Sequence, residues 1–121
     1  MNKVEMNKKL TILLDGQIIT QQAYDVTNQT YDFLAAKFNK EPIENSEMFW
    51  IHLCMALARI EKGEELEGPS QAVVDDIYQT PYKEEIKEVI EFVKDQLHHE
   101  LPKEEQDYFY LHLHGVIENN R

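Results

Sequence analysis

Cysteine, glycine and proline are scarce in this 121-residue sequence, which contains one Cys, four Gly and four Pro. A single cysteine, Cys54, excludes an internal disulfide and a cysteine-based zinc site, and is typical of the reducing cytosol. So few glycines and prolines favour long helices over a sheet with many tight turns. No apolar run approaches the ~20 residues of a membrane span, and Asp15 interrupts the N-terminal apolar patch, so we expect neither a membrane segment nor a signal peptide.

Basic residues are outnumbered as well: 12 Lys and Arg stand against 23 Asp and Glu, which gives a formal net charge of −11. Nucleic acids and anionic membranes are themselves polyanions, so neither is expected as a direct partner. The sequence also lacks the GxSxG, GxGxxG and phosphate-binding glycine-loop motifs of hydrolases and nucleotide-binding enzymes. We therefore predict a cytoplasmic protein that is not an enzyme and carries no cofactor.

What the sequence does contain is helical spacing of its apolar residues along most of its length. This spacing predicts an all-α, compact bundle of five to six helices in a single domain, 1–121. Residues 1–20 are predicted to form an N-terminal extension or short helix, and residues 21–121 the helical bundle. The helices are expected at about residues 3–14, 21–38, 47–61, 71–78, 81–97 and 102–118.

Several residues have the chemistry of helix ends. Thr20 and Thr80 are predicted N-caps, with Pro81 at the first helical position after Thr80, and Asn45 or Ser46 is the predicted N-cap of the third helix. Gly63 is a natural residue to close that third helix.

The third helix is apolar almost all round and is therefore expected in the middle of the fold. Its Phe49, Trp50 and Cys54 are predicted core residues, together with the methionines. The fourth and fifth helices should each turn an apolar stripe inward, made of Val73, Val74, Ile77 and Tyr78 in the fourth and Ile86, Val89, Ile90, Val93 and Leu97 in the fifth.

The five histidines are the residues that suggest reactivity near neutral pH. His98 and His99 are adjacent, so they diverge by about 100° on a helix and fit a helix-end surface pair. His112 and His114 also diverge, and the i, i+4 spacing of a two-histidine metal face is missing. A small metal-dependent enzyme built on His112, His114 and nearby carboxylates is therefore the least supported interpretation, and we predict no metal.

His52 and His112 are more informative, because each lies in a predicted core helix. Arg59 is seven residues after His52, about two turns away on the same face. A neutral imidazole can accept a phosphoryl group, and a nearby guanidinium can then hold the dianion. His112 has Tyr108 at i−4 and Gly115 at i+3, which leaves space beside its ring. The simpler alternative is that each histidine is satisfied in the core or at its boundary.

Three segments, taken together, resemble a known family. They are FWIHLCMALARIEKGEEL, EGPSQAVVDDIYQTPYKEEIKEVIEFV and ELPKEEQDYFYLHLHGVIENNR. Their order and spacing are similar to the PRD, the phosphotransferase-system regulation domain of bacterial transcriptional antiterminators and activators. The family pattern places a histidine before AL-x-R-L, then G-x-E-(I/L), then E-L-P-x-x-E, and finally Y/F-x-x-L-H-L. The resemblance covers roughly residues 29–121.

The resemblance implies a compact helical bundle, often a homodimer, with His52 and His112 as phosphoacceptors and Arg59 as a supporting residue. The implied donor is the histidine-containing phosphocarrier protein or a sugar-permease phosphoprotein. Fewer than 30 residues precede the match, so we interpret the chain as a stand-alone PRD that acts through protein–protein contacts. A full-length PRD regulator is then a candidate output partner.

One position favours an alternative. Many family members carry Asp before the first histidine, whereas this sequence has Ile51 there. The alternative function is a structural or interaction module that keeps the PRD fold without being phosphorylated.

Overall fold

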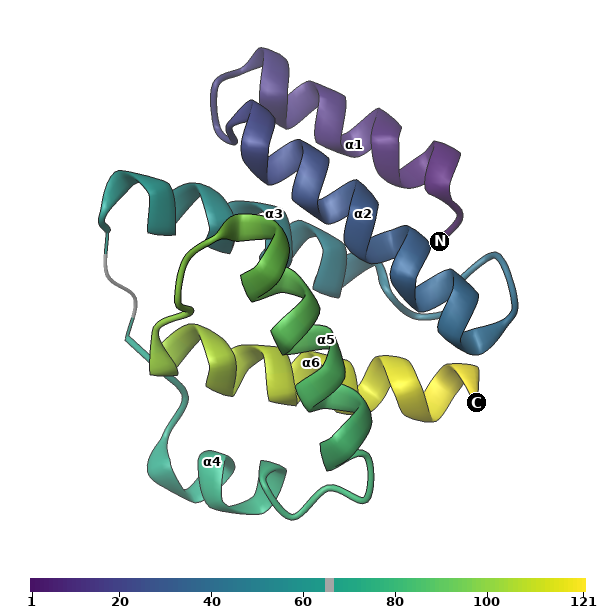
Figure 1. Ribbon diagram of the computed structural model, residues 1–121, viewed down its shortest axis with the longest axis vertical. Coiled ribbons are helices and arrows are strands. Elements are labelled where there is room, and N and C mark those ends of the chain that lie inside the picture. The colour runs from purple at the N-terminus through teal and green to yellow at the C-terminus, as the bar shows by residue number, and fades with distance from the viewer. Residues whose placement is uncertain (65–66) are drawn as a thin grey trace.

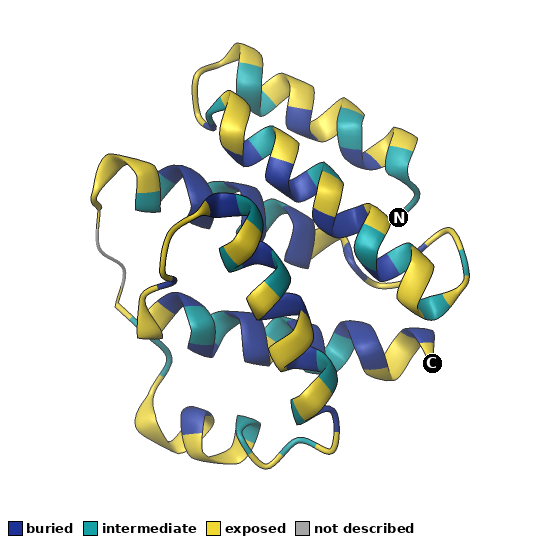
Figure 2. Ribbon diagram, in the orientation of Figure 1, coloured by how far each residue is buried: buried dark blue, intermediate teal, exposed yellow. Residues whose placement is uncertain are grey.

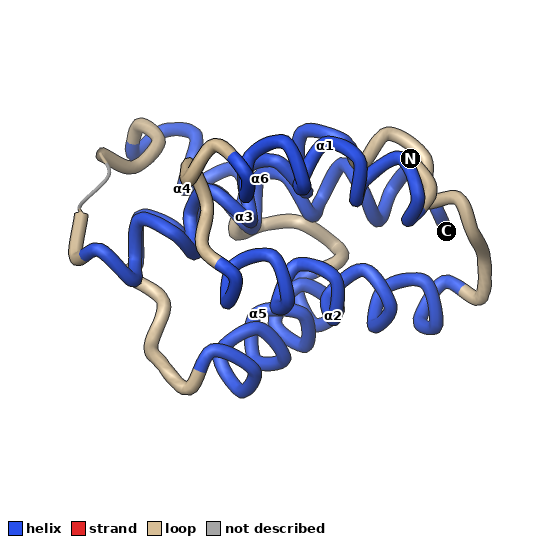
Figure 3. Tube along the Cα trace, turned by 90° about the horizontal axis from the view of Figure 1, so that it is seen from above, coloured by secondary structure: helices blue, strands red, loops and turns tan. Residues whose placement is uncertain are grey.

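The computed structural model describes residues 1–64 and 67–121, and within them the chain forms six helices and no strand. These are α1 (Lys3–Asp15), α2 (Gln21–Phe38), α3 (Glu47–Lys62), α4 (Gln71–Ile77), α5 (Lys83–Leu97) and α6 (Lys103–Asn120). The predicted all-α bundle is confirmed (Figures 1 and 3). Glu65 and Leu66 of the GEEL step lie outside the described residues.

Several helix ends follow the local chemistry of the sequence. The Thr20 side chain accepts a hydrogen bond from the Ala23 N–H at the start of α2. Gly63 ends α3 with a left-handed φ of 72°, a conformation that glycine adopts without steric penalty. These two predicted caps are confirmed.

Of the two other predicted caps, Thr80 is wrong, whereas Ser46 occupies its predicted N-cap position. The fifth helix begins at Lys83 and not at Pro81, because the Thr80 hydroxyl is engaged by the Tyr82 N–H and by a ring nitrogen of His114 on α6. Ser46 precedes α3, but its side chain makes no capping bond. Its hydroxyl instead donates to the Ile43 carbonyl and accepts the indole N–H of Trp50.

The helices pack so that α3 lies against α1, α2 and α6. Helices α1 and α2 form an antiparallel pair at one end of the molecule, and α4 lies at the other end, as Figure 1 shows. Helix α5 contacts both α2 and α6, and a stacked pair, Phe33 and Phe92, joins it to α2 with ring centroids 4.4 Å apart. The central position predicted for the third helix is confirmed.

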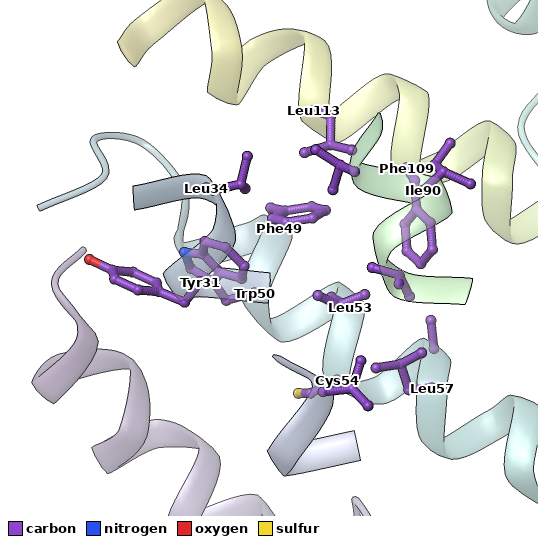
Figure 4. Close-up of a cluster of buried hydrophobic side chains, with 14 of the residues drawn as sticks. Tyr31, Leu34, Phe49, Trp50, Leu53, Cys54, Leu57, Ile90, Phe109 and Leu113 are labelled. Atoms are coloured by element: carbon purple, nitrogen blue, oxygen red, sulfur yellow. The ribbon is translucent and has the colours of Figure 1, made fainter. Parts of the chain in front are cut away.

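The buried residues lie on the helix faces that point inward (Figure 2). Phe49, Trp50 and Cys54 of α3 are buried as predicted, and Figure 4 shows them beside side chains from α2, α5 and α6. Two predicted core residues are instead exposed: Met48 at 71% and Val73 at 39%. Both lie on the outer sides of helices whose opposite sides already face the core.

The two ends of the chain are tied to the loop between α2 and α3. The Met1 amino group donates to the Ile43 carbonyl at 2.6 Å. At the other end, the buried Asn120 amide accepts from the Glu44 N–H and donates to the Glu44 carbonyl, at 2.6 and 2.7 Å. These bonds hold α1 and α6 in fixed positions relative to α3. None of the helices described in residues 1–64 and 67–121 is long and apolar enough to cross a membrane.

Candidate functional site

The site is built where α3 packs on α6. His52 and Arg59 are seven residues apart on α3, and Glu105 and His112 are seven residues apart on α6. Seven residues are about two helical turns, so each pair shares one helix face. The two helices run in opposite directions here, because His52 lies beside His112 while Arg59 lies beside Glu105. The matched spacing therefore brings all four side chains together along one interface.

The two imidazoles are direct neighbours. The ring centroids of His52 and His112 are 4.9 Å apart and the ring planes are inclined by 38°. Aromatic rings from α6 enclose His52, with the Tyr108 centroid at 5.1 Å and the Phe109 ring edge-on at 6.0 Å. The side chain of His52 keeps 19% of its surface exposed, so the pair lies just beneath the surface.

This environment keeps both histidines neutral at physiological pH. Burial, the neighbouring His112 and the charge of Arg59 lower the pKa of His52 to about 4. Burial also lowers the pKa of His112. Desolvation disfavours the charged imidazolium, so each ring retains a nitrogen lone pair. An unprotonated nitrogen is the form of imidazole that can act as a nucleophile.

Arg59 is already occupied by an ion pair. Its Nη2 donates to both carboxylate oxygens of Glu105, at 3.2 and 3.1 Å, and the Glu105 side chain is only 4% exposed. Burial raises the pKa of Glu105 and outweighs the opposite effect of Arg59. Arg59 therefore does not stand free beside His52, and its charge is shared with a buried carboxylate.

One nitrogen of His52 faces that carboxylate. Its Nε2 is 3.8 Å from Glu105 Oε1, which is too long for a hydrogen bond. The same Nε2 is buried and has no hydrogen-bond partner among the described residues, as is also true of Arg59 Nε. Because His52 is neutral, this contact is not an ion pair. The polar atoms of the site are thus close together but incompletely paired.

The remaining histidines lie elsewhere. His114 turns away from His112, with Nδ1 2.7 Å from the Thr80 hydroxyl and Nε2 3.1 Å from the Glu118 carboxylate. His98 closes α5 in a left-handed conformation with φ 55°, and both it and His99 are exposed. The predicted divergence of His112 and His114 is confirmed, since only His112 reaches His52, and His98 and His99 lie exposed at a helix end as predicted.

The sequence was also compared with known proteins. The family model for the PRD domain matches residues 42–116, well over half of the chain. No curated protein and no solved structure matches the sequence. The chain therefore belongs to the PRD family, the regulatory phosphorylation domains controlled by the sugar phosphotransferase system. The matched segment includes His52, Arg59, Glu105 and His112.

Two neighbours of the histidine pair carried no functional role in the sequence-based prediction. Glu105 was not singled out, and Tyr108 was noted only as the residue one turn before His112. The available signal was the seven-residue spacing that occurs in both helices, which predicts an Arg–Glu pair in register with a His–His pair once the helices are antiparallel.

Proposed function

We propose that this protein is a stand-alone PRD-like regulatory module that accepts a phosphoryl group on His52 or His112 and acts through protein–protein contacts. The observation that carries the proposal is the pair of neutral imidazoles, 4.9 Å apart, near the surface of the α3–α6 interface. The module performs no catalysis of its own, works in the cytoplasm and receives its phosphoryl group from the histidine-containing phosphocarrier protein or a sugar-permease phosphoprotein.

The switching step follows from charge. A phosphohistidine adds up to about two negative charges. Here those charges arrive at the α3–α6 interface, where Glu105 is itself negative and buried. The charge of Arg59 acts on His52, so Arg59 must then be shared between the carboxylate and the phosphoryl group. That sharing weakens the Arg59–Glu105 pair and changes which packing of α6 on α3 has the lower free energy.

We propose a homodimer as the state that responds. Leu111 precedes His112 on α6 and is 38% exposed, so a large apolar side chain is available next to the candidate acceptor. A full-length PRD regulator is the proposed output partner, which this module engages in one phosphorylation state. Light scattering of the phosphorylated and unphosphorylated protein tests the dimer, because a monomer in both states contradicts it.

The test of phosphorylation is reconstitution in vitro. The protein is incubated with phosphoenolpyruvate, enzyme I and the phosphocarrier protein, and acid-labile phosphate is measured by intact mass. We expect phosphate gain in the wild type, reduced gain in His52→Ala or His112→Ala, and none in the double variant. His114→Ala is the matched control, since His114 lies on the same helix but outside the pair. Phosphate that persists in the double variant would contradict the assignment.

A second candidate function is a PRD fold that binds partners without being phosphorylated. Ile51 in place of the acidic residue and the buried Nε2 of His52 favour it. Its signature is the absence of phosphate gain when the donor is demonstrably charged, together with dimer or partner binding that is indifferent to His52→Ala and His112→Ala.

A further inference from the structure

The position of Glu105 bears on which atom of His52 reacts. In the unphosphorylated protein Glu105 Oε1 lies 3.8 Å from His52 Nε2, while both carboxylate oxygens are held by Arg59. A carboxylate held against one imidazole nitrogen favours the tautomer that carries its proton there. The other nitrogen then keeps the lone pair.

Burial also distinguishes the two ring nitrogens of His52, and it too favours Nδ1 as the reactive atom. Nε2 is fully covered and has no hydrogen-bond partner in the described part of the chain. A phosphoryl group attached there would project its oxygens onto the Glu105 carboxylate, where like charges repel in a site with little water. Nδ1 is not one of the buried atoms without a hydrogen-bond partner, and the side chain as a whole keeps part of its surface exposed.

We infer that Glu105 is the positioning residue of the acceptor: its carboxylate, 3.8 Å from Nε2, favours the imidazole proton on that nitrogen by charge and thereby makes Nδ1 the atom that receives the phosphoryl group. Only one part of this inference, the identity of the atom that receives the phosphoryl group, rests on the proposed function. Glu105 comes from α6 and supplies, from across the interface, the carboxylate that the residue before the histidine, Ile51, does not provide.

The transfer step is balanced without any further reactant. The Nδ1 lone pair of His52 attacks the phosphorus of the donor phosphohistidine, and a new N–P bond forms. The N–P bond of the donor breaks and its electron pair returns to the donor imidazole. Positive charge develops on the His52 ring, whose Nε2–H stays in place. That charge strengthens the attraction to Glu105 and shortens the 3.8 Å contact toward hydrogen-bond length.

The experiment first determines which nitrogen of His52 carries the proton and then which nitrogen carries the phosphoryl group. Long-range ¹H–¹⁵N correlation spectra of the unphosphorylated, ¹⁵N-labelled protein give the tautomer of His52. We expect Nε2–H with an unprotonated Nδ1. The phosphorylated protein is then examined by ³¹P and ¹⁵N spectra, and we expect the phosphoryl group on Nδ1. Either an Nδ1–H tautomer or a phosphoryl group on Nε2 would overturn the inference.

Variants separate positioning from folding. Glu105→Gln should reduce the preference for Nε2–H and slow phosphorylation of His52 by about tenfold or more, the usual effect of removing such an orienting partner. Glu105→Asp keeps the charge and should restore part of the rate. Glu104→Gln is the control, because Glu104 is an exposed neighbour. If Glu105→Gln retains the wild-type tautomer and rate, Glu105 is not the positioning residue.

The two hypotheses fail differently. An Nε2–H tautomer that weakens in Glu105→Gln, in a protein that gains no phosphate from a charged donor, would refute the proposed function while supporting the role of Glu105 in setting the tautomer. Phosphate on His52 Nε2 would support the proposed function and overturn this inference. An Nδ1–H tautomer in the wild type would overturn the inference even if the Glu105 variants do not fold.

Discussion

At the scale of single residues, burial controls what His52 can do. Its side chain shares the α3–α6 interface with His112, Arg59 and a buried carboxylate, and no partner there completes the hydrogen bonds of its Nε2. The protein therefore holds an unprotonated imidazole where a charged one would be costly. A histidine held neutral in this way should lower the free energy of unfolding in acid, and this loss can be measured.

The first prediction concerns that acid stability. The pKa of His52 is lowered to about 4 in the folded protein, against about 6.5 in an unfolded chain. Between these values the unfolded state binds the extra proton, so stability should fall as the pH drops from about 6.5 to about 4. His52→Gln should remove that part of the loss. In urea titrations the stability difference between wild type and variant should change by about 3 kcal/mol over this range, since one pKa unit is about 1.4 kcal/mol.

The control for this measurement is His99→Gln, because His99 is exposed at the end of α5. Its pH profile should follow that of the wild type. A His52→Gln profile parallel to the wild type throughout would show that His52 is not held neutral by its surroundings.

At the scale of elements, the existence of each helix was predictable because apolar spacing and capping chemistry are local. Thr20 and Gly63 act within a few residues of themselves, and both predictions are confirmed. Thr80 could not be placed the same way, since its hydroxyl contacts His114, 34 residues away on α6. The Ser46 hydroxyl likewise bonds the Ile43 carbonyl and the Trp50 indole and not a backbone N–H of α3. Non-local partners of this kind leave no periodic signal in the sequence.

The second prediction compares two glycines whose replacement by alanine should change the stability of the protein in opposite directions. A Cβ added at Gly63 or at Gly115 meets nothing within 4 Å, so neither substitution causes a clash. Gly63 has φ 72°, and Gly63→Ala should destabilise the protein by about 1 kcal/mol through backbone strain. Gly115 lies inside α6, and Gly115→Ala should stabilise it by about 0.5–1 kcal/mol. Thermal unfolding of the two variants should shift in opposite directions, and shifts of the same sign would contradict the argument.

The third prediction concerns the attachment of α4. The Tyr78 hydroxyl at the end of α4 donates to the buried Asp107 on α6 at 2.7 Å. Burial and this bond raise the pKa of Tyr78. Tyr78→Phe leaves one Asp107 oxygen without that donor, which should weaken the attachment by about 2 kcal/mol. Amide hydrogen exchange in α4 should then accelerate by about tenfold or more.

Tyr110→Phe is the matched control for α4. The Tyr110 ring stacks on Tyr78 with centroids 4.2 Å apart, but its hydroxyl bonds no residue of the described chain. Exchange in α4 should be unchanged in this variant. Equal acceleration in both variants would show that ring packing, and not the Asp107 bond, holds α4.

At the scale of the whole molecule, the site was predictable in part. The resemblance located His52, His112 and Arg59, and the fold places the first two side by side. The binding of Arg59 by Glu105 could not be read from either helix alone, because it depends on the relative register of α3 and α6. Sequence spacing fixes which residues share a face of one helix, whereas packing of the whole bundle decides which faces meet.

The extent of the folding unit gives the last prediction. Helix α1 lies before the segment matched by the family, residues 42–116. We propose that it is nevertheless part of one cooperative domain, because Leu10 is completely buried and the Met1 amino group is bonded to Ile43. Leu10→Ala should then lower the stability of the entire bundle by about 2–5 kcal/mol.

Two probes measure that effect in one urea titration. The fluorescence of Trp50 reports on α3, and far-ultraviolet circular dichroism reports on all helices. The two transitions should coincide in the wild type and move together to lower urea in Leu10→Ala. Ile12→Ala is the control on the same helix, since Ile12 is 70% exposed and its loss removes little buried area. A Leu10→Ala variant that leaves the Trp50 transition in place would show that α1 unfolds on its own and that the domain begins after it.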